Sequence, residues 1–213
     1  MSAAPATFLG RVAPFVVVLL NLAPLAGVIW LGWDAATVLM LYWAENVVVG
    51  LFVAFRILCA GAARGVSGLA GAVGMAAFFV VHYGFFCFGH LFFLAGMFLQ
   101  DEFAGFPNPV RAMEWLAGQG VGWSLALLAL IQVYELVLWL ARGGPRRSLP
   151  NREMGRAYPR MLLLHVTIIA AGSVVVGAGQ PAWAVGILVL LKIAVDIWQI
   201  RRPDRTVSQE AAA

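Results

Sequence analysis

A continuous apolar run from Ala72 to Leu99 constrains this chain more than any other feature. It covers about 28 residues, and about 20 are enough for a helix to cross the hydrocarbon core of a bilayer. Hydrophobic residues make up 62% of the sequence and charged residues only 11%, whereas soluble domains carry roughly 25% charged residues. The chain is therefore predicted to be an integral membrane protein.

The other apolar segments are also continuous, which favours helices over the alternating strands of a barrel. We predict an all-α polytopic bundle of six transmembrane helices, forming a single domain over residues 12–200. Residues 1–11 are expected to be a short cytoplasmic N-terminus and residues 201–213 a disordered cytoplasmic tail. The predicted helices cover about residues 12–33, 36–59, 72–99, 121–141, 158–177 and 182–200.

Arginines are distributed unevenly between the two sides of this predicted bundle. One side receives Arg11, Arg64 and the six arginines from Arg142 to Arg160, whereas the other side receives only Arg111. The positive-inside rule then predicts an inner-membrane protein with both termini in the cytoplasm. The net charge of +4 reflects this topology and does not indicate nucleic-acid binding. We expect the basic loop from Arg142 to Arg160 to contact anionic lipid headgroups.

Ionisable side chains inside the apolar segments are the candidate functional groups, because lipid penalises a polar group that lacks a partner. Depth along each predicted helix follows from a rise of about 1.5 Å per residue. On this estimate five such groups fall within one central layer of the membrane or one turn from it: Glu45, His82, His165, Lys192 and Asp196. His90 lies about 12 Å outward of His82 on the same predicted helix.

Two motifs carry a resemblance to a known family: YWxEN at residues 42–46 and HYGxFxxxH at residues 82–90. Together they resemble a group of bacterial multi-pass membrane proteins that is catalogued as a domain of unknown function. The resemblance covers most of the chain and implies polytopic membrane character. It marks Glu45, His82 and His90 as features of the group, and it implies no activity.

The first functional hypothesis is a metal-dependent membrane enzyme. His82 and His165, together with Asp196 or Glu45, would bind Zn²⁺ or another divalent ion through three protein ligands, which leaves one position for water. The carboxylate that does not bind the metal could then act as general base. His90 is a further candidate ligand. The sequence contains no compact ligand motif of the His-Glu-x-x-His type, so this hypothesis depends on helices that meet in space.

Two further residues would complete such an enzyme. Glu45 is the candidate general base, and Lys192 would stabilise an oxyanion. A lipid or another membrane-embedded substrate suits a site at this depth. Lys192 and Asp196 are one helical turn apart, so they could instead simply pair with each other.

Three alternatives remain open at this point. The first is a proton-coupled transporter or relay that uses Glu45, His82, Lys192 and Asp196. The second is a structural scaffold in which the polar groups only hold the helices together. The third is a haem-binding electron carrier with two of the three histidines as axial ligands.

Overall fold

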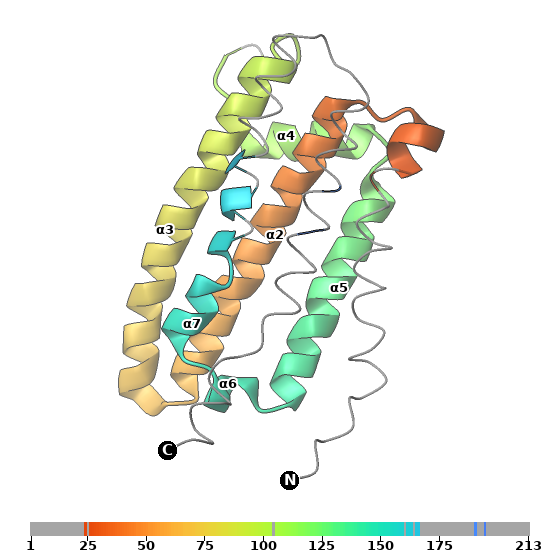
Figure 1. Cartoon of the computed structure of the whole chain (residues 1–213). Coiled ribbons are helices and arrows are strands. Elements are labelled where there is room, and N and C mark those ends of the chain that lie inside the picture. The colour runs from red at the N-terminus through yellow and green to blue at the C-terminus, as the bar shows by residue number, and fades with distance from the viewer. Residues whose placement is uncertain are drawn as a thin grey trace. The chain divides into compact units, whose positions relative to one another are not determined.

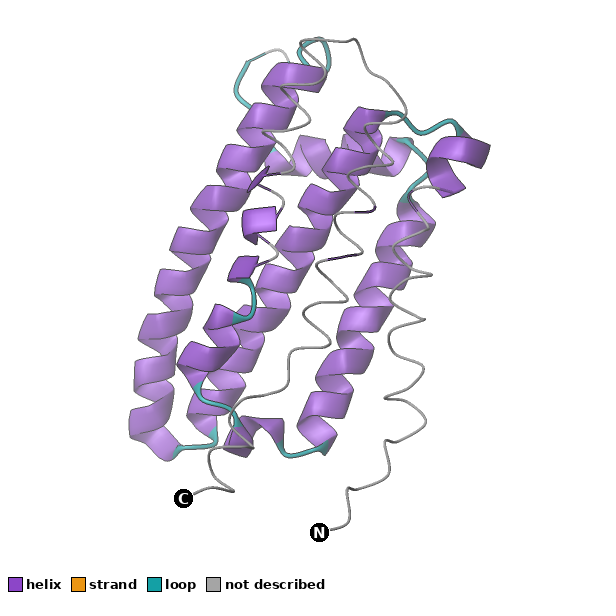
Figure 2. Ribbon diagram, in the orientation of Figure 1, coloured by secondary structure: helices purple, strands orange, loops and turns teal. Residues whose placement is uncertain are grey.

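A computed structural model of the chain describes residues 24, 26–103, 105–159, 161–163, 165–166, 190 and 194. The chain divides into two compact units, one formed by residues 34–179 and the other by residues 1–33 and 180–213. All the helices named below belong to the first unit. Every regular element among the described residues is a helix (Figure 2), as the predicted all-α class requires.

Two long helices, α2 (Ala35–Ala62) and α3 (Gly65–Phe98), form an antiparallel hairpin (Figure 1). Helix α2 begins where the Asp34 carboxylate accepts a hydrogen bond from the Thr37 backbone N–H at 2.8 Å, which satisfies one of the free donors of the first turn. Only a two-residue turn separates the helices. Gly65 makes this turn possible with φ of +82°, a conformation that other residues rarely adopt.

Helix α3 begins at Gly65, seven residues before the start predicted from the apolar run. The segment from Gly61 to Gly71 is rich in small residues, and its composition predicts a loop. Apart from the turn at residues 63–64, it is helical instead, because those small residues let the two backbones approach closely at this end of the hairpin. Close packing thus outweighs the low helix propensity of glycine.

The next two helices are α4 (Pro109–Gly118) and α5 (Gly122–Ala141). Helix α4 lies within the predicted loop between spans and runs across the end of the bundle in Figure 1. The Asn108 side chain caps it by accepting from the Val110 N–H at 2.8 Å. Its buried residues, Ala112 and Leu116, are one turn apart and anchor one face of the helix.

The basic linker after α5 folds into two short helices, α6 (Gly144–Arg147) and α7 (Pro150–Gly155). Each has a proline in its first turn, where the missing N–H costs nothing. Both helices pack against α2, so the linker turns back along the bundle. Residues 158–159, 161–163 and 165–166 then continue in helical conformation.

The hydrophobic core of this unit lies between α2, α3 and the segment after α7. Val49, Val53 and Ile57 from α2 meet a row of α3 residues that includes Phe79 and Tyr83. Ala157 and Met161 pack against the same cluster. The third segment therefore fills the groove of the hairpin.

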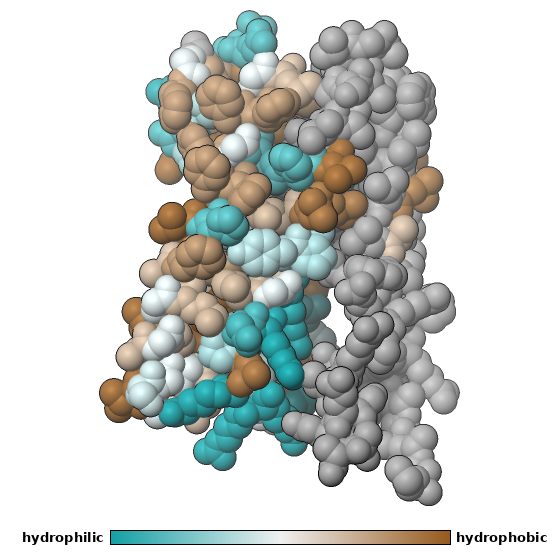
Figure 3. All heavy atoms as spheres, turned by 60° about the vertical axis from the view of Figure 1, so that its left-hand side comes forward, coloured by the Kyte–Doolittle hydropathy of each residue, from teal (hydrophilic) through white to brown (hydrophobic). Residues whose placement is uncertain are grey.

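Three helices among the described residues, α2, α3 and α5, are long and apolar enough to cross a membrane, which suggests membrane association. The predicted spans at residues 12–33, 158–177 and 182–200 lie largely outside the described residues, so the count of six stays a prediction. Figure 3 shows hydrophilic side chains gathered at the lower end of one face, beneath a band of apolar residues.

Candidate functional site

The two sequence motifs meet across the hairpin and form a hydrogen-bond network. The Trp43 indole Nε1–H donates to the backbone carbonyl of Cys87 at 2.8 Å. The Tyr83 hydroxyl lies 3.2 Å from both the backbone carbonyl and the side-chain oxygen of Asn46. Asn46 in turn donates to the Tyr42 carbonyl at 2.9 Å. These bonds fix the register of α2 against α3.

Gly50 completes this contact by leaving room for an aromatic ring. A Cβ at Gly50 would lie 2.7 Å from the nearest carbon of the Tyr83 ring, well inside van der Waals contact. Sequence analysis did not single out Trp43 or Tyr83 as partners across the hairpin. The sequence did offer an indication, because the indole N–H of a buried Trp and the hydroxyl of a buried Tyr each need a hydrogen-bond partner.

The second feature is a pair of histidines contributed by two segments. His90 on α3 and His165 in the segment after α7 place their Nε2 and Nδ1 atoms 2.9 Å apart. His90 is buried, whereas His165 is exposed. The other ring nitrogen of His90, Nδ1, is buried and makes no hydrogen bond within the described part of the chain.

His82 lies apart from this pair. Its ring is exposed and makes aromatic contacts, stacking on Phe78 with 5.3 Å between ring centroids and meeting the edge of Phe86 at 5.2 Å. It also approaches Tyr158 at 5.9 Å. The expected pairing of His82 with His165 is therefore absent, since His165 contacts His90 instead.

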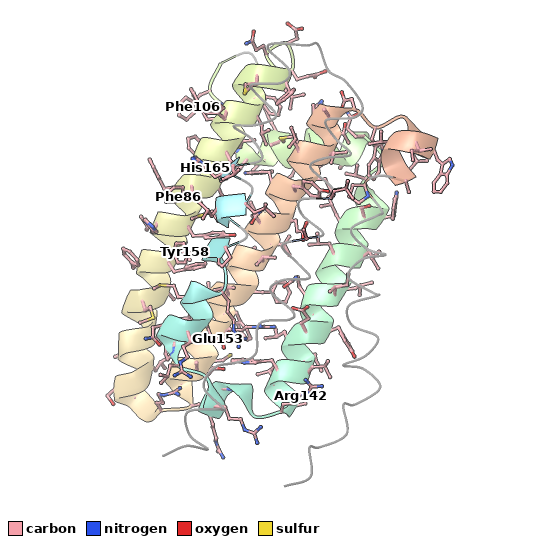
Figure 4. The ribbon with its side chains drawn as sticks, in the orientation of Figure 1. Phe86, Phe106, Arg142, Glu153, Tyr158 and His165 are labelled. Atoms are coloured by element: carbon pink, nitrogen blue, oxygen red, sulfur yellow. The ribbon has the colours of Figure 1, made fainter. Side chains whose placement is uncertain are left out.

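The change of partner has a simple geometric cause. Tyr158 contacts His82, and His165 contacts His90, so the segment after α7 runs alongside α3 in the same direction (Figure 4). The sequence estimate placed Tyr158 at the inner end of a span. The preceding linker, however, already runs along the bundle as α7, which packs against α2 and α3, and His165 therefore lies at the level of His90 on α3.

The other predicted site residues are distributed as follows. Glu45 lies on α2 with only 8% of its surface exposed. Lys192 and Asp196 lie outside the described residues. Over the ranges that the structure describes, no three His, Cys, Asp or Glu side chains form a group that could hold a metal ion. The described residues thus do not support the predicted metal centre.

The arrangement that remains is a hydrogen-bonded pair of imidazoles. A separation of 2.9 Å between two ring nitrogens requires one nitrogen to carry a hydrogen and the other to offer its lone pair. Each neutral ring carries one proton, one of these two protons lies in the shared hydrogen bond, and the pair can take up one more. Such a pair can bind a proton and pass it on.

A family model described as a family of unknown function, DUF6498, matches residues 3–213. The chain belongs to the DUF6498 family. No curated protein and no solved structure matches it. The match extends over both motifs and all three histidines, so the hydrogen-bond network and the histidine pair both lie within the DUF6498 domain.

The network gives a first prediction for this DUF6498 protein. Tyr83→Phe removes only the hydroxyl that donates to Asn46, and it should lower the free energy of unfolding by about 0.5–1.5 kcal/mol, because a side-chain hydrogen bond between membrane helices has roughly this value. This change in the free energy of unfolding is measured by titrating the protein with dodecyl sulfate in mixed micelles. Tyr134→Phe, at an exposed tyrosine on α5, is the matched control. Equal stability of the two variants would contradict this role for the hydroxyl.

Proposed function

We propose that this protein is a multi-pass inner-membrane proton relay, in which His90 and His165 bind a proton and transfer it between two helices, as in proton-coupled transporters. The observation that carries the proposal is the 2.9 Å separation of His90 Nε2 and His165 Nδ1. Once the pair has bound one additional proton, the proton in this hydrogen bond can move from the cationic ring to the neutral ring with little rearrangement. Histidine suits this task because each of its two ring nitrogens can bind or release a proton.

The environment of the two rings supports a relay. His90 is 4% exposed and lies on α3, eight residues before its end at Phe98, or about 12 Å along the helix. His165 is exposed. The pair thus connects an exposed side chain to a buried ring nitrogen. A proton can enter at His165 and continue inward from the buried Nδ1 of His90.

The proposed topology has six spans with both termini in the cytoplasm. It rests on the positive-inside rule and on the ends of the described spans. Helix α2 ends at Ala62 and α5 at Ala141, next to the arginine-rich helices α6 and α7. On this topology the histidine pair lies toward the outer side of the membrane.

A divalent metal centre is the second candidate function. It is favoured by the convergence of the two ring nitrogens, since a small outward movement would let both bind one Zn²⁺ at about 2.0–2.1 Å. A third ligand would have to come from outside the described residues, where the Asp196 of the sequence-based prediction also lies. Glu45 and Lys192 keep their predicted catalytic roles only in this second candidate.

The test exploits the fact that the chain contains only three histidines. Purified protein is reconstituted into liposomes that contain a pH-sensitive dye, and proton uptake is driven by a potassium diffusion potential. We expect His90→Gln and His165→Gln each to reduce the proton flux at least about tenfold, as for loss of a general acid–base group. His82→Gln is the matched control, because its exposed ring lies two turns away on the same helix, and it should keep the flux.

Two outcomes would overturn the relay. One is a wild-type flux no greater than that of protein-free liposomes, and the other is an equal loss in all three variants. Nitrogen NMR of labelled histidine provides an independent measurement, since His90→Gln should shift the His165 signals and leave those of His82 unchanged. One metal ion per chain that is lost in both His90→Gln and His165→Gln would favour the metal centre instead.

A further inference from the structure

The linker between α5 and the segment of His165 has an unusual distribution of charge. Residues 142–156 contain five arginines and one acidic residue, Glu153. Glu153 is completely buried, whereas all five arginines are exposed: Arg142, Arg146, Arg147, Arg152 and Arg156. The surface of this segment therefore carries positive charge alone.

The short helices that carry these arginines are held in place by the fold. Helices α6 and α7 both pack against α2, and α6 also packs against α5. The Arg64 guanidinium donates to the Pro145 carbonyl at 3.2 Å, which joins the α2–α3 turn to the start of α6. Beneath the surface, the Glu153 Oε2 lies 3.4 Å from the Arg156 Nη1. The linker is thus a fixed surface and not a free loop.

This surface lies at the level where the apolar helices end. Arg56 lies over the ring of Trp139 at 5.4 Å, and the Trp139 indole donates to the Ser148 hydroxyl at 3.3 Å. A tryptophan with one polar and one apolar side is typical of the membrane–water interface. Figure 4 places Arg142 and Glu153 at the same end of the bundle, where Figure 3 shows hydrophilic side chains gathered below the apolar band.

We propose that the exposed arginines of α6 and α7 form a docking surface for the headgroups of anionic phospholipids, such as phosphatidylglycerol, in the membrane that the chain spans. Positive charge at the interface attracts anionic lipid, and guanidinium groups suit phosphate because they bind it in a bidentate manner. Exposed Leu149 lies between the two helices and can enter the acyl boundary. The proposal requires a membrane-embedded chain but does not depend on the histidine pair.

The test measures lipid selectivity at the surface of the full chain. Protein reconstituted in phosphatidylcholine vesicles receives trace spin-labelled phosphatidylglycerol or phosphatidylcholine, and electron paramagnetic resonance gives the relative affinity of the motionally restricted lipid. We expect the wild type to prefer phosphatidylglycerol several-fold. The triple variant R146Q/R147Q/R152Q should lose most of this preference. Each basic residue near the membrane surface raises the affinity for anionic lipid by a factor of about five at most.

Two controls separate lipid docking from a general loss of structure. R111Q removes the exposed arginine of α4, at the opposite end of the bundle, and should keep the preference. R146K/R147K/R152K keeps the charge and should retain most of the preference, which should fall in 1 M salt because of screening. The proposal is overturned if the wild type does not distinguish the two lipids, or if the lysine and glutamine triple variants lose the preference equally.

Discussion

Replacing Gly61 by alanine is expected to destabilise the α2–α3 hairpin by about 2–3 kcal/mol, although the change adds a single methyl group. A Cβ at Gly61 would overlap the Ala72 Cβ and would lie 2.8 Å from the Gly68 carbonyl oxygen. Neither of these groups can rotate away, so the helices must separate. Overpacking of this kind costs up to about 3 kcal/mol.

Gly84 provides the matched control on α3. A Cβ there would meet no atom within 4 Å, so Gly84→Ala should stabilise the protein by about 0.5–1 kcal/mol through the better helix propensity of alanine. The free energy of unfolding in mixed micelles distinguishes the two substitutions by sign. Equal free energies of unfolding for Gly61→Ala and Gly84→Ala would contradict the close approach of α2 and α3 at the turn.

The second large effect is expected from Glu153→Ala. Glu153 is completely buried, its Oε2 lies 3.4 Å from Arg156, and it also attracts Arg56 electrostatically. Removal of the carboxylate leaves two arginines that repel each other at the junction of α2 and α7. Loss of one partner of a fully buried ion pair costs about 3–5 kcal/mol. Because the Arg156 side chain is 45% exposed, we expect a smaller loss of about 1–3 kcal/mol.

A double-variant cycle tests this interpretation. If the loss arises from uncompensated positive charge, Glu153→Ala combined with Arg156→Ala should be less destabilised than the sum of the single variants. Glu114→Ala, at an exposed acidic residue of α4, is the control and should change the free energy of unfolding by less than about 0.5 kcal/mol. Strict additivity of the two substitutions would show that Glu153 and Arg156 are not coupled.

The sequence by itself determined the helical class of this protein and the apolar character of helices that are long enough to cross a membrane. Continuous apolar runs in lipid must satisfy their backbone hydrogen bonds internally, so only helices fit. Helices α2 and α5 accordingly start and end within a few residues of the apolar runs. The polar residues of the two motifs were also recognised as exceptional, because lipid penalises unpartnered polar groups.

Only the tertiary structure decided which of these groups meet. Depth estimated from sequence assumes that each helix starts at the membrane surface, and this fails where a connection folds back along the bundle. The linker forms α6 and α7 against α2, and these contacts, which no local pattern encodes, set where the following described residues lie along α3. His165 therefore lies beside His90 and not beside His82. Likewise, most of the small residues from Gly61 to Gly71 form helix and not loop, because α2 and α3 pack closely against each other there. Local helix propensity carries no information on such a contact between helices.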